Sequence, residues 1–425
     1  MKEYPYWWDS PAPWFRPVPS PALPGRVDVA IVGAGYTGLA AARVVAQSGA
    51  SVVVLERERV GWGASSRNAG QVLTGLRLDP AALVARFGAA QAQKLFQVSL
   101  ESIDALDRLI SSEDIDCDLE RTGHIQAASK PSHFDVFRDE QALLARVFDH
   151  RVALVPAADQ HSEIGSDAYF GLMIDERSQA LNPARFVDGL AAAAARAGAA
   201  LAEGVRVTRL VRAGPRWIVT TERGAIDAGD VLLATNGYTD EAAPWLQRRL
   251  VPIGSYIIAT EPLSPADASM LVPRRRMAFD SKHFLHYFRV TRDRRLLFGG
   301  RAEFGTPRAE TTARCADILR RDMTVIFPAL ASARIEYAWG GNVAFTRDQL
   351  PHAGRLRGAY YAGGYGGHGV AMATFLGTLI GRRLAGESID HPLFDDRFPA
   401  IPLYWGTPWF LPLAGAYYRV KDWLE

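Results

Sequence analysis

The clearest hydrophobic pattern in the chain begins just after residue 26. An apolar run at 27–32 predicts a buried β-strand, a glycine turn follows at 33–38, and an Ala-rich segment at 39–47 predicts a helix. A second apolar run at 51–55 predicts another strand. Strand, turn, helix and strand in this order form a βαβ unit, so we expect its two strands to be parallel and buried.

The periodicity changes several times farther along the chain. Apolar residues at helical spacing predict a helix at 79–114, and Ala-rich sequence predicts another at 183–198. Between them, residues 119–173 read as short β runs joined by loops. Residues 249–337 are dense in β-branched and aromatic side chains, which predicts an antiparallel sheet. The remaining expected elements are strands at 199–210, 216–221, 230–233 and 359–362 and a helix at 370–384.

These elements predict an α/β fold of mixed α+β character with two domains, which suits a chain of 425 residues. One is a Rossmann-like nucleotide-binding domain assembled from separated pieces, and the other is an antiparallel-sheet substrate domain. We expect an N-terminal arm at 1–26, the nucleotide-binding domain at 27–115, 183–248 and 338–390, the substrate domain at 116–182 and 249–337, and a C-terminal tail at 391–425.

Composition and charge exclude several functional classes. There are 48 Lys and Arg against 46 Asp and Glu, with no basic block, so nucleic-acid binding is not indicated. The two cysteines, Cys117 and Cys315, lie far apart without CxxC spacing, which argues against a disulfide framework or a metal site and favours the reducing cytoplasm. The Pro-rich start lacks a signal-peptide core, and no apolar run of about 18 residues predicts a spanning helix.

The glycine turn carries the most specific chemistry. Gly33 permits a tight turn, Gly35 lets the backbone approach a pyrophosphate, and Gly38 lets the helix pack closely on the strand. Glu56 ends the second strand, where a carboxylate can accept hydrogen bonds from ribose hydroxyls. This context favours nucleotide binding over a merely structural turn.

Four later clusters are also rich in glycine or other small residues. The loop at 61–71 combines glycines with hydroxyl, guanidinium and amide groups, and it reads equally well as a cofactor wall or an ordinary turn. A small-residue turn ends the strand at 232–237, and a Trp-Gly-Gly motif stands at 339–341. The glycine loop at 363–369 runs into a helix, whose N-terminus is a preformed site for negative charge.

Taken in order, six segments of the chain resemble the FAD-dependent D-amino-acid-oxidase-like superfamily. They read DVAIVGAGYTGL, VVVLERERVGWGASSRNAGQ, ATNGY, HYFRVTRDRRLLFGGR, WGGNVAFTRDQLPHAGRL and YYAGGYGGHGVAMATFLG. The resemblance spans nearly the whole chain and is strongest to the branch containing γ-glutamylputrescine oxidase, with sarcosine and glycine oxidases more distant. It implies an FAD extended across the nucleotide domain, with its isoalloxazine ring facing the substrate domain.

The resemblance also implies a set of cofactor-binding residues. They are Gly33, Ala34, Gly35, Tyr36, Thr37 and Gly38 at the pyrophosphate, Glu56 and Arg57 at the ADP-ribose, Gly63, Ala64, Ser65, Ser66, Arg67, Asn68, Ala69, Gly70 and Gln71 beside the phosphate and flavin, Val205 at the adenine, Gly364, Tyr365, Gly366, Gly367, His368, Gly369 and Val370 at the flavin pyrimidine, and Thr235, Asn236, Gly237, Trp339 and Gly341 elsewhere.

Two departures from relatives bear on the cofactor chemistry. Some relatives attach FAD through a histidine where this chain has Asn68, and others through a cysteine after Trp339, where this chain has none, so we predict noncovalent FAD. Sarcosine oxidases use a lysine near the flavin to activate oxygen. Leu297 falls at that place, which argues against efficient oxidase chemistry.

The activity implied by the resemblance is oxidation of a C–N bond in an amine or an N-substituted or cyclic amino acid, with hydride transfer to flavin N5 giving an imine. One alternative is a dehydrogenase that passes electrons to a quinone or another acceptor instead of O2. A second is a flavin-containing assembly partner without turnover, and a third is an NAD-dependent dehydrogenase that uses the same turn. A small-molecule amine or amino acid is the expected partner.

Four residues are candidates for catalysis. Arg289 could pair with a substrate carboxylate or simply bridge strands, and His368 could sit beside the flavin or be structural. The amide of Gly367, with the helix N-terminus behind it, would stabilise negative charge near flavin N1. Tyr256 would belong to an aromatic pocket that keeps the amine neutral. The other expected pocket walls are His286, Tyr287, Phe288, Trp339 and Tyr365.

The tail at 403–421 is aromatic and ends in basic residues. Such a segment could lie in a membrane interface and bring the reduced flavin near a quinone, but packing on its own domain is favoured. We therefore expect a cytoplasmic enzyme with a possible peripheral membrane contact. Nothing in the sequence predicts an oligomeric state.

Overall fold

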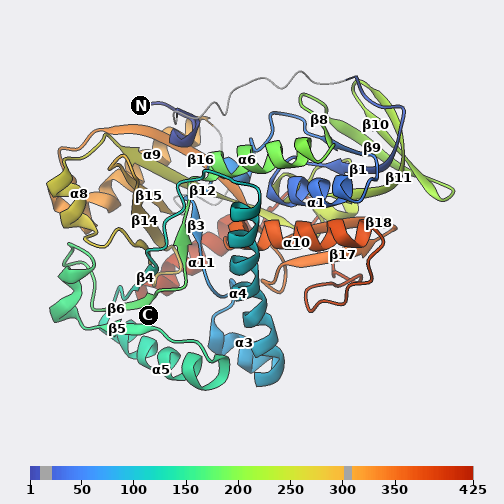
Figure 1. Cartoon of the computed structure of the whole chain (residues 1–425). Helices are drawn as coiled ribbons and strands as arrows, with labels where there is room; N and C mark the ends of the chain where they lie inside the picture. Colours follow the sequence, from blue (N-terminus) through green and yellow to red (C-terminus); the bar gives the residue numbers. More distant parts are fainter. Residues whose placement is uncertain (10–21, 301–308, 425) are drawn as a thin grey trace.

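The computed structural model describes residues 1–9, 22–300 and 309–424. Within them the chain forms two eight-stranded sheets that lie side by side, with helices around them (Figure 1). Part of the expected N-terminal arm, residues 10–21, lies outside the described residues. The α/β class with a discontinuous Rossmann-like domain and a second sheet domain is confirmed.

The first sheet is built on the predicted βαβ unit, in which β1 pairs in parallel with β2 and α1 connects them. Strands β11, β8 and β18 extend the parallel sheet on its two sides, while β9, β10 and β17 add antiparallel edges. The bounds are β1 Arg26–Val32, α1 Tyr36–Gln47, β2 Val52–Leu55, β8 Ala200–Ala202, β9 Val207–Ala213, β10 Arg216–Thr221, β11 Gly224–Leu233, β17 His352–Leu356 and β18 Ala359–Gly363.

Alternation along β1 and β2 puts apolar side chains on both faces of this sheet. Ile31 and Val54 face α1 and the helices α4 (Ala89–Ser112), α6 (Pro183–Arg196) and α10 (Gly369–Leu384). Ala30 and Val53 face the opposite side, with residues of β9 and β10. Both faces are therefore covered, as parallel strands require, and the carboxyl ends of the strands are left to build a site.

The second sheet follows the order β16-β12-β15-β14-β13-β4-β6-β5. Neighbouring strands of this sheet pair antiparallel, except β13 and β4, which are parallel. Helices α8 and α9 cover one face. The bounds are β4 His124–Ala127, β5 Ala153–Val155, β6 Leu172–Asp175, β12 Val251–Thr260, α8 Pro265–Leu271, β13 Met277–Asp280, β14 His286–Val290, β15 Leu296–Gly300, α9 Ala309–Ile326 and β16 Ile335–Phe345.

Three details of the expected layout need correction. The boundary at residue 338 falls inside β16, which pairs with β12 along its length and so belongs to the second sheet. Residues 119–173 contain a long helix, α5 (Pro131–Phe148), whose buried Phe134, Phe137, Leu144 and Phe148 follow helical spacing. Helix α9 likewise lies within the segment read as sheet alone. The other domain boundaries stay a prediction.

The remaining elements of the described structure are mostly short. They are η1 Tyr6–Asp9, α2 Ala64–Arg67, β3 Gln71–Val72, α3 Pro80–Phe87, η2 Ala157–Ser162, β7 Gln179–Ala180, η3 Asn236–Tyr238, α7 Pro244–Gln247, η4 Pro328–Leu330 and α11 Leu411–Leu424. Strands β3 and β7 form a separate two-stranded sheet.

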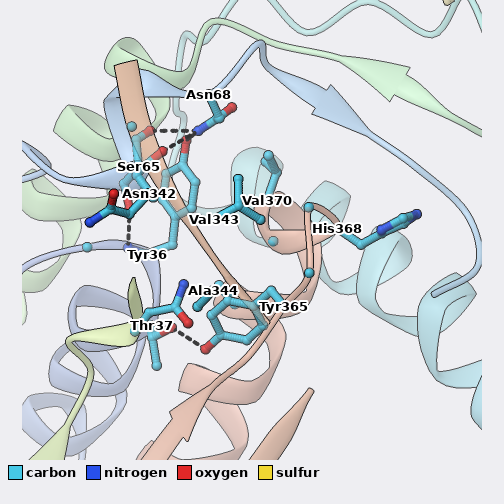
Figure 2. A pocket seen from close by; sticks show the side chains of 18 of the residues that line it. Tyr36, Thr37, Ser65, Asn68, Asn342, Val343, Ala344, Tyr365, His368 and Val370 are labelled. Atoms are coloured by element: carbon cyan, nitrogen blue, oxygen red, sulfur yellow. Dashed lines mark hydrogen bonds between the residues drawn. The ribbon is translucent and has the colours of Figure 1, made fainter. Parts of the chain in front are cut away.

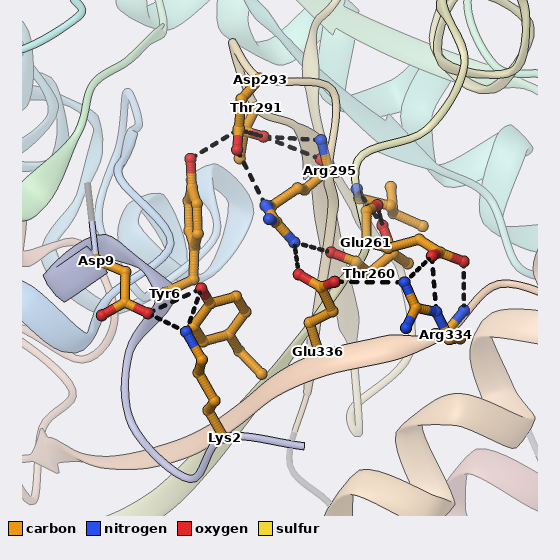
Figure 3. Close-up of polar contacts among 12 residues, drawn as sticks. Lys2, Tyr6, Asp9, Thr260, Glu261, Thr291, Asp293, Arg295, Arg334 and Glu336 are labelled. Atoms are coloured by element: carbon orange, nitrogen blue, oxygen red, sulfur yellow. Dashed lines mark hydrogen bonds and ion pairs between the residues drawn. The ribbon is translucent and has the colours of Figure 1, made fainter. Parts of the chain in front are cut away.

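The first nine residues dock on the second sheet. Lys2 forms a β-bridge with Tyr337 of β16, and its ammonium group donates to Asp9 at 2.5 Å. Tyr6 donates its hydroxyl proton to Asp293, which also pairs with Arg295 (Figure 3). A second run of ion pairs in the same view joins Arg295 to Glu336 and Arg334 to Glu261. The start of the chain is therefore fixed to this edge by polar contacts.

The C-terminal tail packs partly on the body of the protein. Tyr404 is buried, and its hydroxyl donates to the carbonyl of Leu250 at 3.0 Å. Around it, several large apolar side chains remain exposed, namely Leu403, Trp405, Trp409, Leu413 and Tyr417. Among the described residues, no helix combines the length and apolar character needed to cross a membrane. A peripheral membrane contact stays a prediction.

Candidate active site

A cavity of about 480 Å³ runs between the two sheets. One end lies at the carboxyl ends of β1, β2 and β11, and the middle is walled by the loop at 61–71, by β16 and by the loop before α10. The other end reaches β4, β6 and α5. Figure 2 shows the middle section, where Thr37 and Tyr365 share a hydrogen bond of 2.6 Å and His368 points away from the other labelled side chains.

Glycine is required at the turn for steric reasons. Gly33 has φ +103°, and a Cβ there would lie 2.9 Å from the carbonyl oxygen of Ala234. A Cβ on Gly38 would lie 2.0 Å from the Gly33 oxygen, so only glycine lets α1 start against the turn. Gly33 and Gly35 line the cavity, whereas Ala34 and Gly38 lie behind it.

Glu56 stands at the same end with its carboxylate held by the backbone. Its Oε2 accepts from the amide of Ala34 and its Oε1 from the amide of Glu58, both at 3.0 Å. Burial raises the pKa of Glu56 in spite of these two bonds. Arg57 and Val205 line the same end. A carboxylate fixed in this way can receive ribose hydroxyls.

The loop at 61–71 is held by its own polar groups. Ser65 Oγ accepts from the amide of Tyr36 at 3.0 Å, and Asn68 Nδ2 donates to the carbonyls of Ala64 and Ser65 at 2.9 and 3.1 Å. Arg67 stacks on Trp62, with 4.3 Å from its guanidinium carbon to the ring centre. The loop therefore presents a fixed wall and is more than an ordinary turn.

The first residues of the chain brace this loop from outside. Trp7 Nε1 donates to the carbonyl of Asn68 and Trp8 Nε1 to Ser66 Oγ, both at 2.9 Å. On the other side Trp339 Nε1 donates to the carbonyl of Arg67 at 2.8 Å. Three indoles thus hold the loop in place.

The loop before α10 gives the cavity a positive end. Gly366 and Gly367 have φ of +58° and +104°, and space is open where a Cβ of Gly367 would stand. His368 follows as the N-cap and helix α10 begins at Gly369, so the first amides of the helix lack intrahelical partners where Gly369 and Val370 line the cavity. A ring that develops negative charge would be stabilised there.

His368 lines the cavity in its neutral form. Burial lowers its pKa to about 4, and the nearby charge of Arg77 adds to the effect. Its Nδ1 is buried and has no hydrogen-bond partner within the part of the chain that the structure describes. An unpaired polar atom in a cavity wall is a contact point for a bound molecule.

The structure brings most of the predicted cofactor residues to this cavity. Those that line it are Gly33, Gly35, Tyr36, Thr37, Glu56, Arg57, Gly63, Ala64, Ser65, Arg67, Asn68, Ala69, Gln71, Val205, Thr235, Asn236, Gly341, Tyr365, Gly366, Gly367, His368, Gly369 and Val370. Those that stand behind the wall are Ala34, Gly38, Ser66, Gly70, Gly237, Trp339 and Gly364.

Arg289 does not reach the cavity, which corrects its assignment as a carboxylate-binding residue. Its Nη1 donates to the carbonyls of Leu181, Gly70 and Ala69 at 3.0, 3.3 and 3.4 Å, and its Nη2 lies 3.5 Å from Glu120. The side chain is 3% exposed. These contacts support the alternative that Arg289 is structural, since it ties the loop to the second domain.

Tyr256 is also misplaced by the prediction, because side chains alternate along β12. Ser255 and Ile257 line the cavity, while Tyr256 points to the opposite face and its hydroxyl lies 3.1 Å from Thr311 of α9. His286 and Phe288 on β14 share that opposite face. Of the expected aromatic walls, Tyr287 and Tyr365 line the cavity.

Leu297 gives no information on oxygen chemistry in this fold. It is 1% exposed, packs in the core between the domains and does not line the cavity. On β15, the residue paired with Tyr287 of β14 is Gly299. A Cβ on Gly299 would lie 2.3 Å from the Tyr287 ring. The argument against oxidase activity from Leu297 therefore falls.

Sequence reasoning missed the residues at the other end of the cavity. They are Arg77, Asp79, His124, Gln126, Glu140, His150, Asp175 and Phe279. Arg77 and Asp79 follow the polar loop within ten residues, which could have flagged them. The others come from β4, α5, the segment between α5 and β5, β6 and β13, and no motif marks them.

Comparison with known proteins agrees with this geometry. The sequence model of the FAD dependent oxidoreductase family, DAO, matches residues 28–383. The chain belongs to this FAD-dependent oxidoreductase family. It is therefore an oxidoreductase that uses FAD. The residues present fit the cofactor, because the glycine turn, the fixed Glu56 carboxylate and the open space at Gly367 border one continuous cavity.

Several relatives match along most of their length. The chain is 32% identical to gamma-glutamylputrescine oxidoreductase of Escherichia coli over 400 residues, which covers 93% of this chain and 92% of that protein. It is also 32% identical to a probable oxidoreductase, OrdL, of Haemophilus influenzae over 375 residues, with 87% and 85% coverage. Among solved structures, glycine oxidase from Geobacillus kaustophilus matches with a TM-score of 0.77 at 21% identity, covering 90% of this chain and all of that one.

Proposed function

We propose that this FAD-dependent oxidoreductase oxidises the C–N bond of a small amine or amino acid to an imine, which water then hydrolyses. The names of its relatives support this substrate class, since one acts on gamma-glutamylputrescine and fold neighbours are named glycine oxidase and L-proline dehydrogenase. The observation that carries the proposal is the continuous cavity, which joins the nucleotide turn to a chamber lined by both domains.

The chain's own residues prepare this chamber for a neutral amine. When bound, FAD supplies the acceptor for the hydride removed from the carbon beside the nitrogen. Tyr287, Phe279 and Leu285 line the chamber with apolar surface, which disfavours an ammonium ion next to the reacting carbon. His368 adds no charge there, because its pKa is lowered to about 4. The amides at the start of α10 would stabilise negative charge on a ring bound against them.

A carboxylate on the substrate would find a guanidinium at Arg77. This residue lines the cavity on the loop that precedes α3, and its side-chain carbons pack beside Gly366. Its positive charge reaches His368. Because Arg77 lines the cavity and its charge acts on a residue of the loop before α10, we assign to Arg77 the role that Arg289 cannot fill.

Noncovalent FAD is part of the proposal. Asn68 occupies the place of the histidine that some relatives use. Its side-chain Nδ2 donates to the Ala64 carbonyl and its Oδ1 accepts from the Gly70 amide, so both atoms are engaged within the loop. Cys117 and Cys315 are buried away from the cavity. Denaturation by acid should release all of the yellow cofactor into the supernatant. Colour that stays with the precipitated chain would contradict this part.

The activity is tested by anaerobic flavin bleaching. The purified holoenzyme is mixed with a panel of primary amines, secondary amines and amino acids while the oxidised flavin absorbance is followed. At least one class should bleach the flavin and yield the corresponding aldehyde or keto acid with ammonia or an amine. No bleaching across the panel would overturn the proposal. Admitting air to the reduced enzyme then separates an oxidase, which reoxidises rapidly, from a dehydrogenase that needs another acceptor.

A further inference from the structure

The end of the cavity lined by β4, β6 and α5 has a polar character unlike the rest. In Figure 1 these elements lie on the opposite side of the molecule from β1 and β9. We call this region the acidic end and define it by five cavity-lining side chains, Asp79, His124, Glu140, His150 and Asp175. Neither the family resemblance nor the cofactor geometry accounts for it.

Asp175 is a fixed anion with its hydrogen bonds filled. Its Oδ2 accepts from His150 at 2.8 Å and from Thr74 at 2.5 Å, and its Oδ1 accepts from the amide of Arg177 at 2.8 Å. Burial opposes ionisation, but the bond from His150 and its neighbours outweigh it and hold the pKa below the ordinary value. Asp175 therefore sets a negative potential without needing a ligand.

Glu140 lacks such partners. It projects from α5, and neither a hydrogen bond nor an ion pair joins it to any other residue that the structure describes. Burial raises its pKa to about 7, and the like charge of Asp79 adds to the effect. A half-buried carboxylate that borders a cavity without a counter-charge is costly unless a ligand supplies one.

His124 provides an independent sign of a ligand. The ring is 7% exposed and stacks on Phe279 at 5.0 Å, and its Nδ1 lies 3.1 Å from Ser178 Oγ. Its Nε2 is buried and has no partner among the described residues. Burial lowers its pKa to about 4, so the ring is neutral. With the proton on Nδ1, bonded to Ser178, Nε2 offers a lone pair to a donor in the cavity.

The acidic end thus presents acceptors. Two guanidinium groups lie in its neighbourhood: Arg276 acts on His124 but is paired with Glu163 and Glu176, and Arg77 packs beside Gly366 and acts on His368. The charge that acts on Glu140 is the like charge of Asp79. A carboxylate and a neutral imidazole lone pair together suit a cation that carries several N–H donors.

We propose that the acidic end binds a primary ammonium group at the far end of the substrate, so that the enzyme prefers amines that carry a second, distal amino group. Glu140 supplies the counter-charge and His124 Nε2 accepts one of the N–H bonds. This inference rests on the proposed amine oxidation, because the reacting nitrogen is the one that lies at the flavin.

Binding and reduction give separate readouts of the two proposals. The holoenzyme is titrated with α,ω-diaminoalkanes of increasing length and with n-alkylamines of the same lengths. Binding is read from the shift of the oxidised flavin spectrum, and reduction from anaerobic bleaching. For at least one chain length, the diamine should bind about tenfold or more tightly than the matched monoamine. Equal affinity at every length would overturn the acidic end as an ammonium site.

One substitution and a matched control test whether the preference for diamines depends on Glu140. Glu140→Gln should reduce the ratio of diamine to monoamine affinity to within about twofold of unity. Asp139→Asn is the matched control, because Asp139 is the exposed neighbour on the same helix and does not line the cavity, so its ratio should stay that of the wild type. A diamine preference that remains in Glu140→Gln would contradict the assignment of Glu140 as the counter-charge of the distal ammonium group.

A second substitution keeps the test informative if Glu140→Gln loses its cofactor. Asp79→Asn removes the other free charge but keeps α3 capped, because asparagine can replace the aspartate that accepts from Ala82. It should lower the same ratio by a smaller factor, and an unchanged ratio would count against the proposal. If diamines bind preferentially but no amine bleaches the flavin, the ammonium site stands and the proposed oxidation falls.

Discussion

The two ends of the cavity are built by different means. At the nucleotide end, the site is shaped by glycines, which have no side chain, and by backbone amides. Gly33 and Gly38 leave no room for a Cβ, and backbone amides hold the carboxylate of Glu56. At the acidic end, the wall is made of side chains from β4, β6 and α5, such as His124 and Glu140. The first construction tolerates almost no change in the chain, whereas the second can alter its ligand by exchanging single side chains. A common cofactor and a variable substrate call for this division.

The largest expected effect follows at the nucleotide end. Gly38→Ala places a methyl carbon 2.0 Å from the Gly33 oxygen, so α1 must move away from the turn. We expect the purified protein to contain less than about a tenth of the wild-type FAD and to lose several kcal/mol of stability. Flavin absorbance per chain and thermal unfolding measure both.

Gly25→Ala serves as the control for this substitution. A Cβ at Gly25 meets nothing within 4 Å and the residue is exposed just before β1, so FAD content should be unchanged. Full FAD occupancy in Gly38→Ala would break the contrast between the two ends.

Arg289→Met should act on stability and leave substrate choice alone. The guanidinium contacts three carbonyls and Glu120 in a buried position, and its removal takes these hydrogen bonds away. The Gly70 carbonyl keeps the Leu181 amide and Glu120 keeps Arg275, so the Leu181 and Ala69 carbonyls are the most affected. We expect a loss of about 3 kcal/mol in the free energy of unfolding, measured by urea titration. The ratio of rates on carboxylate-bearing and neutral amines should not change. A selective loss of carboxylate substrates would restore Arg289 to the site.

Arg77→Gln should give the converse result. It removes the guanidinium that lines the substrate chamber, so kred/Kd for carboxylate-bearing substrates should fall about ten- to a hundredfold relative to neutral amines. FAD content should remain near that of the wild type. If neutral and acidic substrates lose activity by the same factor, Arg77 is not the carboxylate partner.

The smallest effect is a pH-dependent gain in stability at the acidic end. The pKa of Glu140 is raised to about 7 in the folded protein from an ordinary 4.5, so its ionisation costs stability as pH rises through that interval. Glu140→Gln removes this cost. After allowance for partial exposure, we expect a gain of about 1–2 kcal/mol at pH 8 that vanishes near pH 4. Thermal unfolding at both pH values, with Asp139→Asn alongside, measures it.

The sequence predicted the nucleotide end in detail because its rules are steric. Only glycine fits at Gly33 and Gly38, and the strands on either side follow from simple hydrophobic runs. Helix α5 was missed because its few apolar positions, Phe134 and Phe137 among them, are spread between charged residues and look like short β runs. With α5 unrecognised, Glu140 could not be placed in any site.

The predicted roles of Arg289 and Tyr256 were wrong for a different reason. Both stand on strands of the expected sheet, but which face a strand presents depends on register, which one sequence does not fix. Tyr256 lies one residue from Ser255 and Ile257 and points the other way. Arg289 lies on the expected face of its strand but under the loop, where its guanidinium already donates to the carbonyls of Leu181 and Gly70. The residue type alone therefore could not show that Arg77 lines the cavity and Arg289 does not.

The position of the first residues makes them a clamp between two parts of the molecule. Lys2 pairs with Tyr337 of the edge strand β16, and Trp7 and Trp8 donate to the loop at Asn68 and Ser66. The loop that lines the cavity and the edge of the second sheet are therefore tied to one segment of nine residues. Local unfolding of that segment would loosen both at once.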